Sequence, residues 1–321
     1  MARQWRIEYP GALYHVLSRG NDRQAIFSSD KDRKAFLDLI QQLCERFGIE
    51  VFAYVLMGNH YHLLLRIAQA NLSKAMQWLG TAYTLRFHAN NGTGGHLFQG
   101  RFKSIIVEND AYLLRLSCYI HRNPLRAGIV TRIADYPWSS YPFYAYKKKP
   151  PAWLATGLII NQIHAKDRHA AYRRKVQQYS DEKGGLWEDV KHGLVFGSQS
   201  FLDQLKSRFL KSHPDAELPQ HNRLMLDVDV QQLAEKAARA LGLDLAKLKN
   251  TRRIGSDEKD RRDMLIFLLW QTGGLSNQKI ASMPGMTYSS ISRRASMLKR
   301  RLQTDYELMT QYETIRSQIK V

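Results

Sequence analysis

Residues 51–67 read Val-Phe-Ala-Tyr-Val-Leu-Met-Gly-Asn-His-Tyr-His-Leu-Leu-Leu-Arg-Ile. Both halves of this stretch are rich in β-branched, aromatic and other apolar residues, which favour strands. The pair Gly58-Asn59 separates the halves and is typical of a two-residue hairpin turn. The stretch therefore predicts two antiparallel strands, over 51–57 and 60–67.

The segments around this hairpin alternate between strand-like and helix-like patterns. Apolar residues recur at helical spacing in the longer segments, and strand formers gather in the shorter ones. The expected elements are a strand over 12–18, a helix over 30–47, a helix over 72–89, a strand over 102–107 and a helix from 110 to about 122. With the hairpin, the order predicts a ferredoxin-like split βαβ arrangement and an α+β fold class.

The composition changes at Lys147-Lys148-Lys149-Pro150-Pro151, which indicates a domain boundary. We expect an α+β domain over 1–145, a helical linker or extension over 146–222 and an all-α domain over 223–321. In the last of these, Pro284-Gly285 interrupts the helical pattern before a helix rich in Ser and Arg. Two helices around such a turn are typical of a helix-turn-helix DNA-binding domain.

The charge balance points to a polyanionic partner. The chain has 48 Lys and Arg against 29 Asp and Glu, a net charge of +19, which favours nucleic acid first and an anionic membrane surface second. The longest useful apolar run, 264–270, is far shorter than the roughly 20 residues of a bilayer span, and the first residues lack a signal-peptide pattern. Two cysteines exclude a disulfide framework. We expect a cytoplasmic, nucleoid-associated protein without a membrane partner.

Two pairs of residues have the spacing of a chemical site. His60 and His62 alternate along a strand, so both lie on one face and can share a divalent cation. Tyr119 and Asn123 lie one turn apart on a helix. A tyrosine hydroxyl can act as a covalent nucleophile, and an amide oxygen can complete a metal site. Each pair alone also fits ordinary strand histidines or a core tyrosine, and Tyr112, two turns earlier, is the competing tyrosine.

Several stretches resemble a known enzyme family. Residues 58–64, Gly-Asn-His-Tyr-His-Leu-Leu, resemble the His-hydrophobic-His motif of single-tyrosine transposases, and residues 119–128 resemble their nucleophile helix. Residues 9–16 and 136–141 also fit. The resemblance is in particular to the REP-associated tyrosine transposases of bacteria. It covers about residues 1–145 well and extends weakly to about residue 210.

The resemblance implies an activity and a set of site residues. It implies cleavage and rejoining of single-stranded DNA at REP-like hairpins through a 5′-phosphotyrosine intermediate, with Mg²⁺ or Mn²⁺ as the cofactor. It makes His60 and His62 metal ligands, Tyr119 the nucleophile and Asn123 a third ligand. The implied partner is a single-stranded DNA hairpin with its flanking duplex. Basic residues near the implied site, which could hold the scissile phosphate or the displaced strand, are Arg101, Lys103 and Arg126.

Residues 250–301 resemble the DNA-binding domain of the bacterial chromosomal replication initiator. The resemblance places Arg252 and Arg253 in a basic loop and residues 289–294 in a recognition helix. Phosphate contacts would supply affinity there and base edges would supply register. A solvated basic helix face is the alternative interpretation. The DNA contacts expected on the recognition helix are Ser289, Ser290, Arg293 and Arg294.

Two other functions stay open on the sequence. The first is a non-catalytic regulator that binds DNA hairpins, against which the complete set of His60, His62, Tyr119 and Asn123 argues. The second is a rolling-circle replication initiator or relaxase. Those enzymes often carry two tyrosines about one turn apart on the nucleophile helix, and here no tyrosine follows Tyr119 before Tyr136. The DNA sequence recognised, the metal and the oligomeric state stay open.

Overall fold

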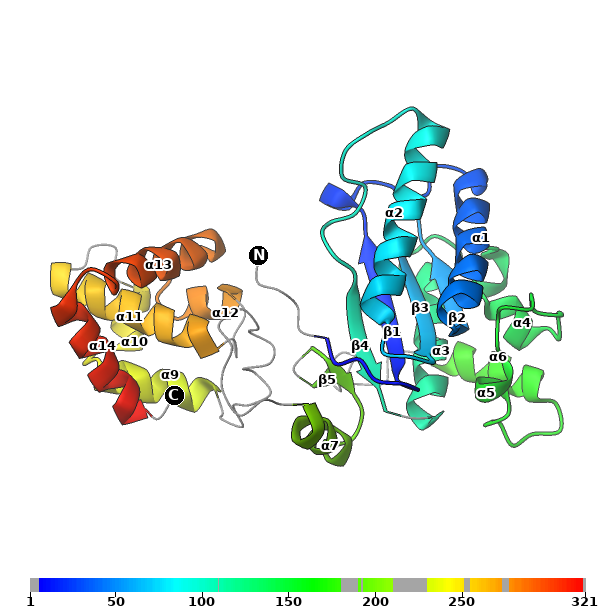
Figure 1. The fold of residues 1–321 in the computed structure, drawn as a ribbon. Helices are drawn as coiled ribbons and strands as arrows, with labels where there is room; N and C mark the ends of the chain where they lie inside the picture. Colours follow the sequence, from blue (N-terminus) through cyan, green and yellow to red (C-terminus); the bar gives the residue numbers. More distant parts are fainter. Residues whose placement is uncertain are drawn as a thin grey trace. The chain divides into compact units, whose positions relative to one another are not determined.

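The computed structural model describes residues 6–108, 110–179, 190–191, 193–209, 230–250, 255–272 and 277–319. The chain divides into two compact units, one comprising Arg6–Gln204 and the other beginning at Leu205. Figure 1 shows the helices and strands of each unit. None of the helices in the described ranges is long and apolar enough to cross a membrane.

The first unit is built on an antiparallel sheet with the strand order β2-β3-β1-β4. Helix α1 follows β1 and helix α2 follows β3, so the expected ferredoxin-like order and the α+β fold class are confirmed. Two short strands, β6 and β5, extend the sheet beyond β4. The elements are β1 (Leu13–Arg19), α1 (Asp30–Phe47), β2 (Ile49–Leu56), β3 (His60–Ile67), α2 (Leu72–Asn91), β4 (Lys103–Val107), α3 (Asp110–Arg126), β5 (Val190–Lys191) and β6 (Val195–Phe196).

The two faces of the sheet carry different helices. Helices α1 and α2 lie side by side over one face (Figure 1), where Phe36 packs its ring against Tyr61 and Tyr83. On the other face, α3 packs through its apolar residues against a core that includes Val55 and Leu64. In the β1–β3 and β2–β3 registers, His62 lies opposite Leu17 and Val55. Since His62 lies two residues before Leu64 on β3, its side chain lies on the same face of the sheet, the face covered by α3.

Helix α3 continues to Arg126, past the end expected near residue 122, and holds Pro124 inside its last turn. Proline has no N–H to donate to the carbonyl four residues earlier, which is that of Ile120. The Asn123 side chain supplies a donor instead: its Nδ2 lies 3.3 Å from Ile120 O and 3.0 Å from Tyr119 O. This side chain therefore supplies a donor to the Ile120 carbonyl that the proline leaves open, and the helix carries Arg126 one turn further.

Residues 146–204, expected to belong to a helical extension, lie in the same compact unit as the sheet. A buried polar network joins them to α3. His121 places Nδ1 2.7 Å from Tyr172 Oη and Nε2 2.7 Å from Ser140 Oγ, and Tyr172 donates to Ser117 Oγ at 2.9 Å. The helices of this segment are α4 (Tyr141–Ala145), α5 (Gly157–Ile160), α6 (Arg168–Gln178) and α7 (Gln199–Phe209), of which α7 crosses the boundary between the units.

The buried His121 gives the first testable prediction, an acid-sensitive stability. Burial lowers the pKa of His121 to about 3, whereas an exposed histidine titrates near 6.5. Between these values only the unfolded chain binds the proton, so the free energy of unfolding falls as the pH falls through this window. From pH 7 to pH 5, urea unfolding of the wild type should lose about 2 kcal/mol more than that of His121→Phe. Equal losses in the two proteins would contradict a neutral buried His121.

The described elements of the second unit are all helices, which confirms the expected helical C-terminal region. Helix α12, residues 283–287 and helix α13 follow one another in the expected order. Gly285 lies between them with φ of +66°, and a Cβ at this position would lie 2.5 Å from Lys249 O. Only glycine therefore fits this turn. The helices are α9 (Val230–Ala240), α10 (Leu245–Asn250), α11 (Ser256–Thr272), α12 (Asn277–Ser282), α13 (Tyr288–Arg301) and α14 (Tyr306–Ile319).

Candidate functional site

The hairpin turn that precedes β3 is held by backbone hydrogen bonds. Met57 N donates to His60 O at 2.8 Å and closes the turn. Gly58 O accepts from Ile26 N at 3.0 Å and ties the turn to the segment before α1. The strand register that follows places His60 opposite Arg19. His60 therefore begins β3 from a fixed backbone position at one end of the sheet.

The protonation of the His60 ring follows from its neighbours. Asn59 Nδ2 donates to Arg23 O at 3.1 Å, so Asn59 Oδ1 is the atom that faces His60 Nδ1 at 2.7 Å. An amide oxygen can only accept, so His60 Nδ1 carries the proton. The unprotonated Nε2 of the neutral ring is then the atom that can bind a cation.

His62 lies deeper in the site and contacts a histidine that the sequence analysis did not select. His62 is 4% exposed, and its Nδ1 lies 2.8 Å from Nε2 of His15 on β1. The two rings stack with their centroids 5.0 Å apart, and the rings of His60 and His62 are 5.2 Å apart. His15 stands 47 residues away in the chain. Only the β1–β3 pairing, which no local pattern specifies, brings it to His62.

Tyr119 lies on α3 against these histidines. Its ring centroid is 6.1 Å from that of His62 and 6.2 Å from that of His15. The competing residue Tyr112 instead packs its ring edge-on against Phe196, with the centroids 4.8 Å apart. The structure therefore brings Tyr119 to the histidine pair and places Tyr112 against the end of the sheet.

Positive charges border this group. The guanidinium carbon of Arg126 lies 5.0 Å from the Tyr119 ring centroid. Arg19, which the sequence analysis did not select, lies opposite His60 in the β1–β3 register. Lys103 begins β4 opposite Leu17 of β1. All three basic side chains belong to exposed residues, so they can attract an anion to the residues that they border.

Burial and these charges keep the histidines neutral. Burial, followed by the charges of His15, His60 and Arg126, lowers the pKa of His62 well below its ordinary value. Burial, followed by the charge of Arg19, lowers the pKa of His60. Both rings are therefore unprotonated at one nitrogen at neutral pH, which is the form that binds a metal.

The donor set allows a cation with imidazole and oxygen ligands. Within the described ranges, no group of three or more His, Cys, Asp or Glu side chains could hold a metal ion. A cation at His60 and His62 would therefore take its other ligands from an amide, water or a bound anion. Asn123 engages Nδ2 with helix carbonyls, so Oδ1 is the atom of this side chain that could act as a ligand. The residues present fit a divalent cation that accepts both nitrogen and oxygen.

Other basic residues predicted to contact DNA are Arg101 and the two arginines of the expected basic loop. Arg101 is exposed two residues before β4 begins, and its role stays a prediction. The two loop arginines lie outside the described residues: Arg252 and Arg253.

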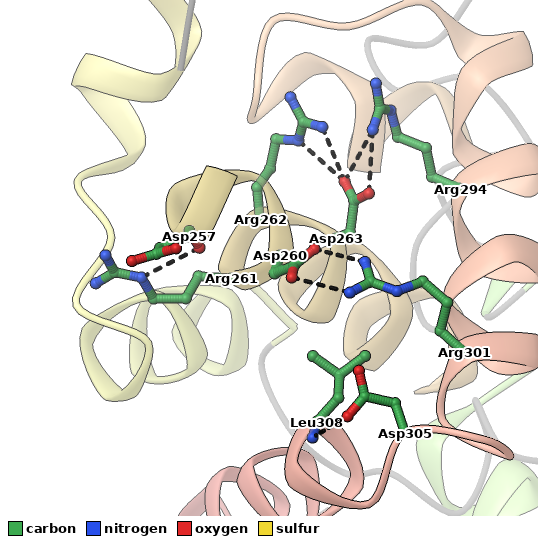
Figure 2. Close-up of polar contacts among 9 residues, drawn as sticks. All are labelled: Asp257, Asp260, Arg261, Arg262, Asp263, Arg294, Arg301, Asp305 and Leu308. Carbon is green, nitrogen blue, oxygen red and sulfur yellow. Dashed lines mark hydrogen bonds and ion pairs between the residues drawn. The ribbon is translucent and has the colours of Figure 1, made fainter. Parts of the chain in front are cut away.

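In the second unit, two of the arginines on α13 form ion pairs with aspartates of α11. Figure 2 shows Arg294 and Arg301 pointing from α13 to carboxylates of α11. Arg294 Nη1 lies 3.0 and 3.1 Å from the oxygens of Asp263, which Arg262 also contacts at 2.9 Å. Arg301 forms two bonds with Asp260, of 2.6 and 3.0 Å. Arg294, an expected DNA contact, therefore holds α13 to α11.

The other expected contacts on α13 differ in exposure. Ser289 and Arg293 are exposed. Ser290 is half-buried, and its Oγ donates to Thr287 O at 2.6 Å, at the start of the helix. Ser289 and Arg293 lie one turn apart, so they present a single outward face. Of the four residues, these two are available to a ligand in solution.

Comparison with known proteins identifies relatives of the first unit. Residues 9–123 match the family model described as "Transposase IS200 like". A protein from Haemophilus influenzae, named as a REP-associated tyrosine transposase, is 26% identical over 142 residues, which cover 41% of this chain and 80% of that protein. The expected resemblance is confirmed over these residues.

Two solved structures are also similar to part of the chain. The first is titled as a REP-associated tyrosine transposase bound to a REP hairpin; it has a TM-score of 0.40 and 19% identity and covers 48% of this chain and 92% of that chain. The second is named as a transposase from Deinococcus radiodurans; it has a TM-score of 0.27 and 19% identity and covers 38% of this chain and 95% of that chain.

Proposed function

We propose, from the match of residues 9–123 to the IS200-like transposase family, that this chain cleaves and rejoins single-stranded DNA at REP-like hairpins. The observation that carries the proposal is the packing of the Tyr119 ring 6.1 Å from that of His62, with Arg126 over the tyrosine. A nucleophilic hydroxyl, two neutral imidazoles and a neighbouring arginine guanidinium together suit attack on a phosphate. The net charge of +19 favours a polyanionic substrate.

The proposed reaction exchanges one phosphate ester for another. Tyr119 Oη loses its proton and forms a bond to the phosphorus, and the bond from phosphorus to the 3′ oxygen breaks. The released 3′ oxygen gains a proton, and the DNA stays attached through a 5′-phosphotyrosine. The covalent bond conserves the energy of the phosphodiester, so a 3′-hydroxyl of another end can reverse the reaction and join the strands.

The residues around Tyr119 would bind and orient the phosphate. Mg²⁺ or Mn²⁺ held by Nε2 of His60 and His62, with Asn123 Oδ1 as a third ligand, would polarise the phosphate oxygens. Arg126 and Lys103 would attract the DNA backbone and hold the strand in line with the tyrosine. Tyr119 is only 6% exposed, so a phosphate must reach into the site, and a single strand can do so more readily than a regular duplex. The name of the Haemophilus influenzae relative, a REP-associated tyrosine transposase, supports REP-associated DNA as the substrate.

A direct assay tests this function. The full chain is incubated with labelled single-stranded hairpin oligonucleotides from its own genome, with Mn²⁺ or Mg²⁺, and resolved on a denaturing gel. We expect a slow-migrating covalent adduct and a released 3′-hydroxyl fragment. Tight hairpin binding without any adduct on any oligonucleotide would favour the non-catalytic regulator instead.

The second unit has a proposed role in binding the duplex next to the hairpin. Helix α12, its glycine turn and α13 have the order of a helix-turn-helix. The exposed face of α13 carries Ser289 and Arg293, while Asp263 is neutralised by two arginines within the unit. This face therefore presents hydrogen-bond donors and positive charge to a DNA groove.

The pair Arg293-Arg294 supplies a matched test of this role. Arg293→Ala should weaken binding of a hairpin with an extended duplex stem by about 1–3 kcal/mol and lower the salt slope by about one. Arg294→Ala should leave the affinity nearly unchanged and lower the unfolding temperature of the unit, because it breaks the pair with Asp263. Fluorescence anisotropy over a salt series and calorimetry measure the two effects. A larger loss of affinity in Arg294→Ala than in Arg293→Ala would contradict the assignment.

A further inference from the structure

His62 has a buried partner, His15, that the sequence analysis did not select. The β1–β3 register pairs Leu17 with His62 and His15 with Leu64, so His15 is a diagonal neighbour of His62 on the α3 face. On the same face of β1, Leu13 and Leu17 are apolar. A histidine among leucines needs a polar partner when it is buried, and His15 Nε2 meets His62 Nδ1 at 2.8 Å.

This contact can be made by two different arrangements of protons. Each imidazole is neutral and carries one proton. If His15 Nε2 holds a proton and donates, His62 carries its own proton on Nε2, the nitrogen that a cation would need. If His62 Nδ1 donates to His15 Nε2, the Nε2 of His62 is unprotonated and open to a cation. The contact therefore decides whether His62 can act as a ligand.

His60 has the second arrangement already. The amide of Asn59 can only accept from His60 Nδ1, because its Nδ2 donates to Arg23 O. Two imidazoles that share one cation each need an unprotonated nitrogen that is not engaged by a neighbour, and at His60 that nitrogen is Nε2. His15 contacts Nδ1 of His62 as Asn59 contacts Nδ1 of His60, but His15 lies on a different strand and inside the core.

We infer that His15 is a positioning residue, which accepts a hydrogen bond from Nδ1 of His62 and keeps Nε2 of His62 directed at the site. This inference rests on the proposed function, in which His62 is a metal ligand. The stacked arrangement, with ring centroids 5.0 Å apart and an interplanar angle of 20°, also restricts rotation of the His62 ring. Hydrogen-bond partners of this kind commonly set both the tautomer and the orientation of a metal-binding histidine.

The proton position can be measured without any metal. In the metal-free full chain labelled with ¹⁵N-histidine, NMR long-range correlations report which ring nitrogen carries the proton. We expect His62 to carry it on Nδ1 in the wild type, and to lose this preference in His15→Phe. The His62→Ala chain identifies the signal by its absence. A wild-type His62 protonated on Nε2 overturns the inference.

Cation affinity gives a second measurement. By Mn²⁺ titration followed with electron paramagnetic resonance, His15→Phe should bind Mn²⁺ about 10–100-fold more weakly than the wild type. His15→Gln should recover part of the affinity, because its side-chain oxygen can accept from His62 Nδ1. The matched control is His121→Phe, which removes another fully buried histidine from the same unit, bonded to Tyr172 and Ser140 rather than to the site. It should leave Mn²⁺ affinity unchanged.

The outcomes separate this inference from the function on which it rests. Equal affinity of His15→Phe and the wild type overturns the positioning role while leaving the metal site intact. Equal losses in His15→Phe and His121→Phe also overturn it, because they indicate general loosening of the unit. If the wild type and His60→Ala bind Mn²⁺ equally poorly, the proposed metal site fails, and the tautomer of His62 still decides the role of His15.

Discussion

The Tyr119→Phe chain should form no covalent adduct with a single-stranded hairpin under conditions in which the wild type does. The substitution removes only the hydroxyl, which is the atom that would attack the phosphorus. Loss of a covalent nucleophile commonly lowers the rate by about 10⁴-fold or more, which places the remaining adduct below detection on a denaturing gel. Binding of the hairpin should change little, because the ring keeps its contacts with His62 and His15.

Tyr112→Phe is the matched control on the same helix. Tyr112 packs against Phe196, so loss of its hydroxyl should leave adduct formation near the wild-type rate. Adduct formed by Tyr119→Phe and absent from Tyr112→Phe would show that the other tyrosine is the nucleophile. Adducts on both variants would point to a nucleophile outside this helix.

Removing the cation ligands is the second change with a large expected effect. His60→Ala or His62→Ala should lower the cleavage rate by about 10³-fold or more, since a cation supplies several kcal/mol of charge stabilisation at a transferring phosphate. His60→Ala is the cleaner variant, because His60 is half-exposed and His62 is buried against His15. Single-turnover cleavage of a labelled hairpin measures the rate.

Chelation tests the same point without a mutation. Cleavage by the wild type should stop in excess EDTA and return when Mg²⁺ or Mn²⁺ is added beyond the chelator. Full-rate cleavage in EDTA would exclude a metal role, whatever the two alanine variants show. Normal cleavage by His60→Ala that is still sensitive to EDTA would indicate that residues other than His60 bind the cation.

The two pairs of results also separate the candidate functions. A hairpin-binding regulator would bind DNA in all of these variants and form no adduct in any of them. A relaxase-like mechanism that uses two tyrosines would retain part of its chemistry in Tyr119→Phe. The proposed single-tyrosine reaction requires complete loss in that one variant.

Local patterns in the sequence determined the frame of the site. The strands over 51–57 and 60–67 and the turn at Gly58-Asn59 follow from side-chain type and alternation, and β2 and β3 lie there within two residues. The one-face placement of His60 and His62 follows from the two-residue period of a strand. These features depend on neighbours in the chain, so the sequence alone was enough to predict them.

The tertiary structure decided which of the candidate residues meet. Tyr119 and Tyr112 lie on one helix and have the same chemistry, and only the packing of α3 brings the first to His62 and the second to Phe196. Asn123 was selected as an oxygen ligand, and the structure shows that its nitrogen bonds to carbonyls around Pro124. Such choices depend on the partner surface, which no helical period contains.

The contacts of His15 and Arg294 show why local sequence could not predict these partners. His15 meets His62 across 47 residues because β1 is the strand beside β3, and a different strand order would place another residue there. Arg293 and Arg294 are adjacent basic residues, and the carboxylate of Asp263 on α11 selects the second as an internal ion pair. Local sequence determined the elements and the faces of their residues. Long-range pairing between those elements, which is set by the burial of whole faces, decided which polar groups became partners.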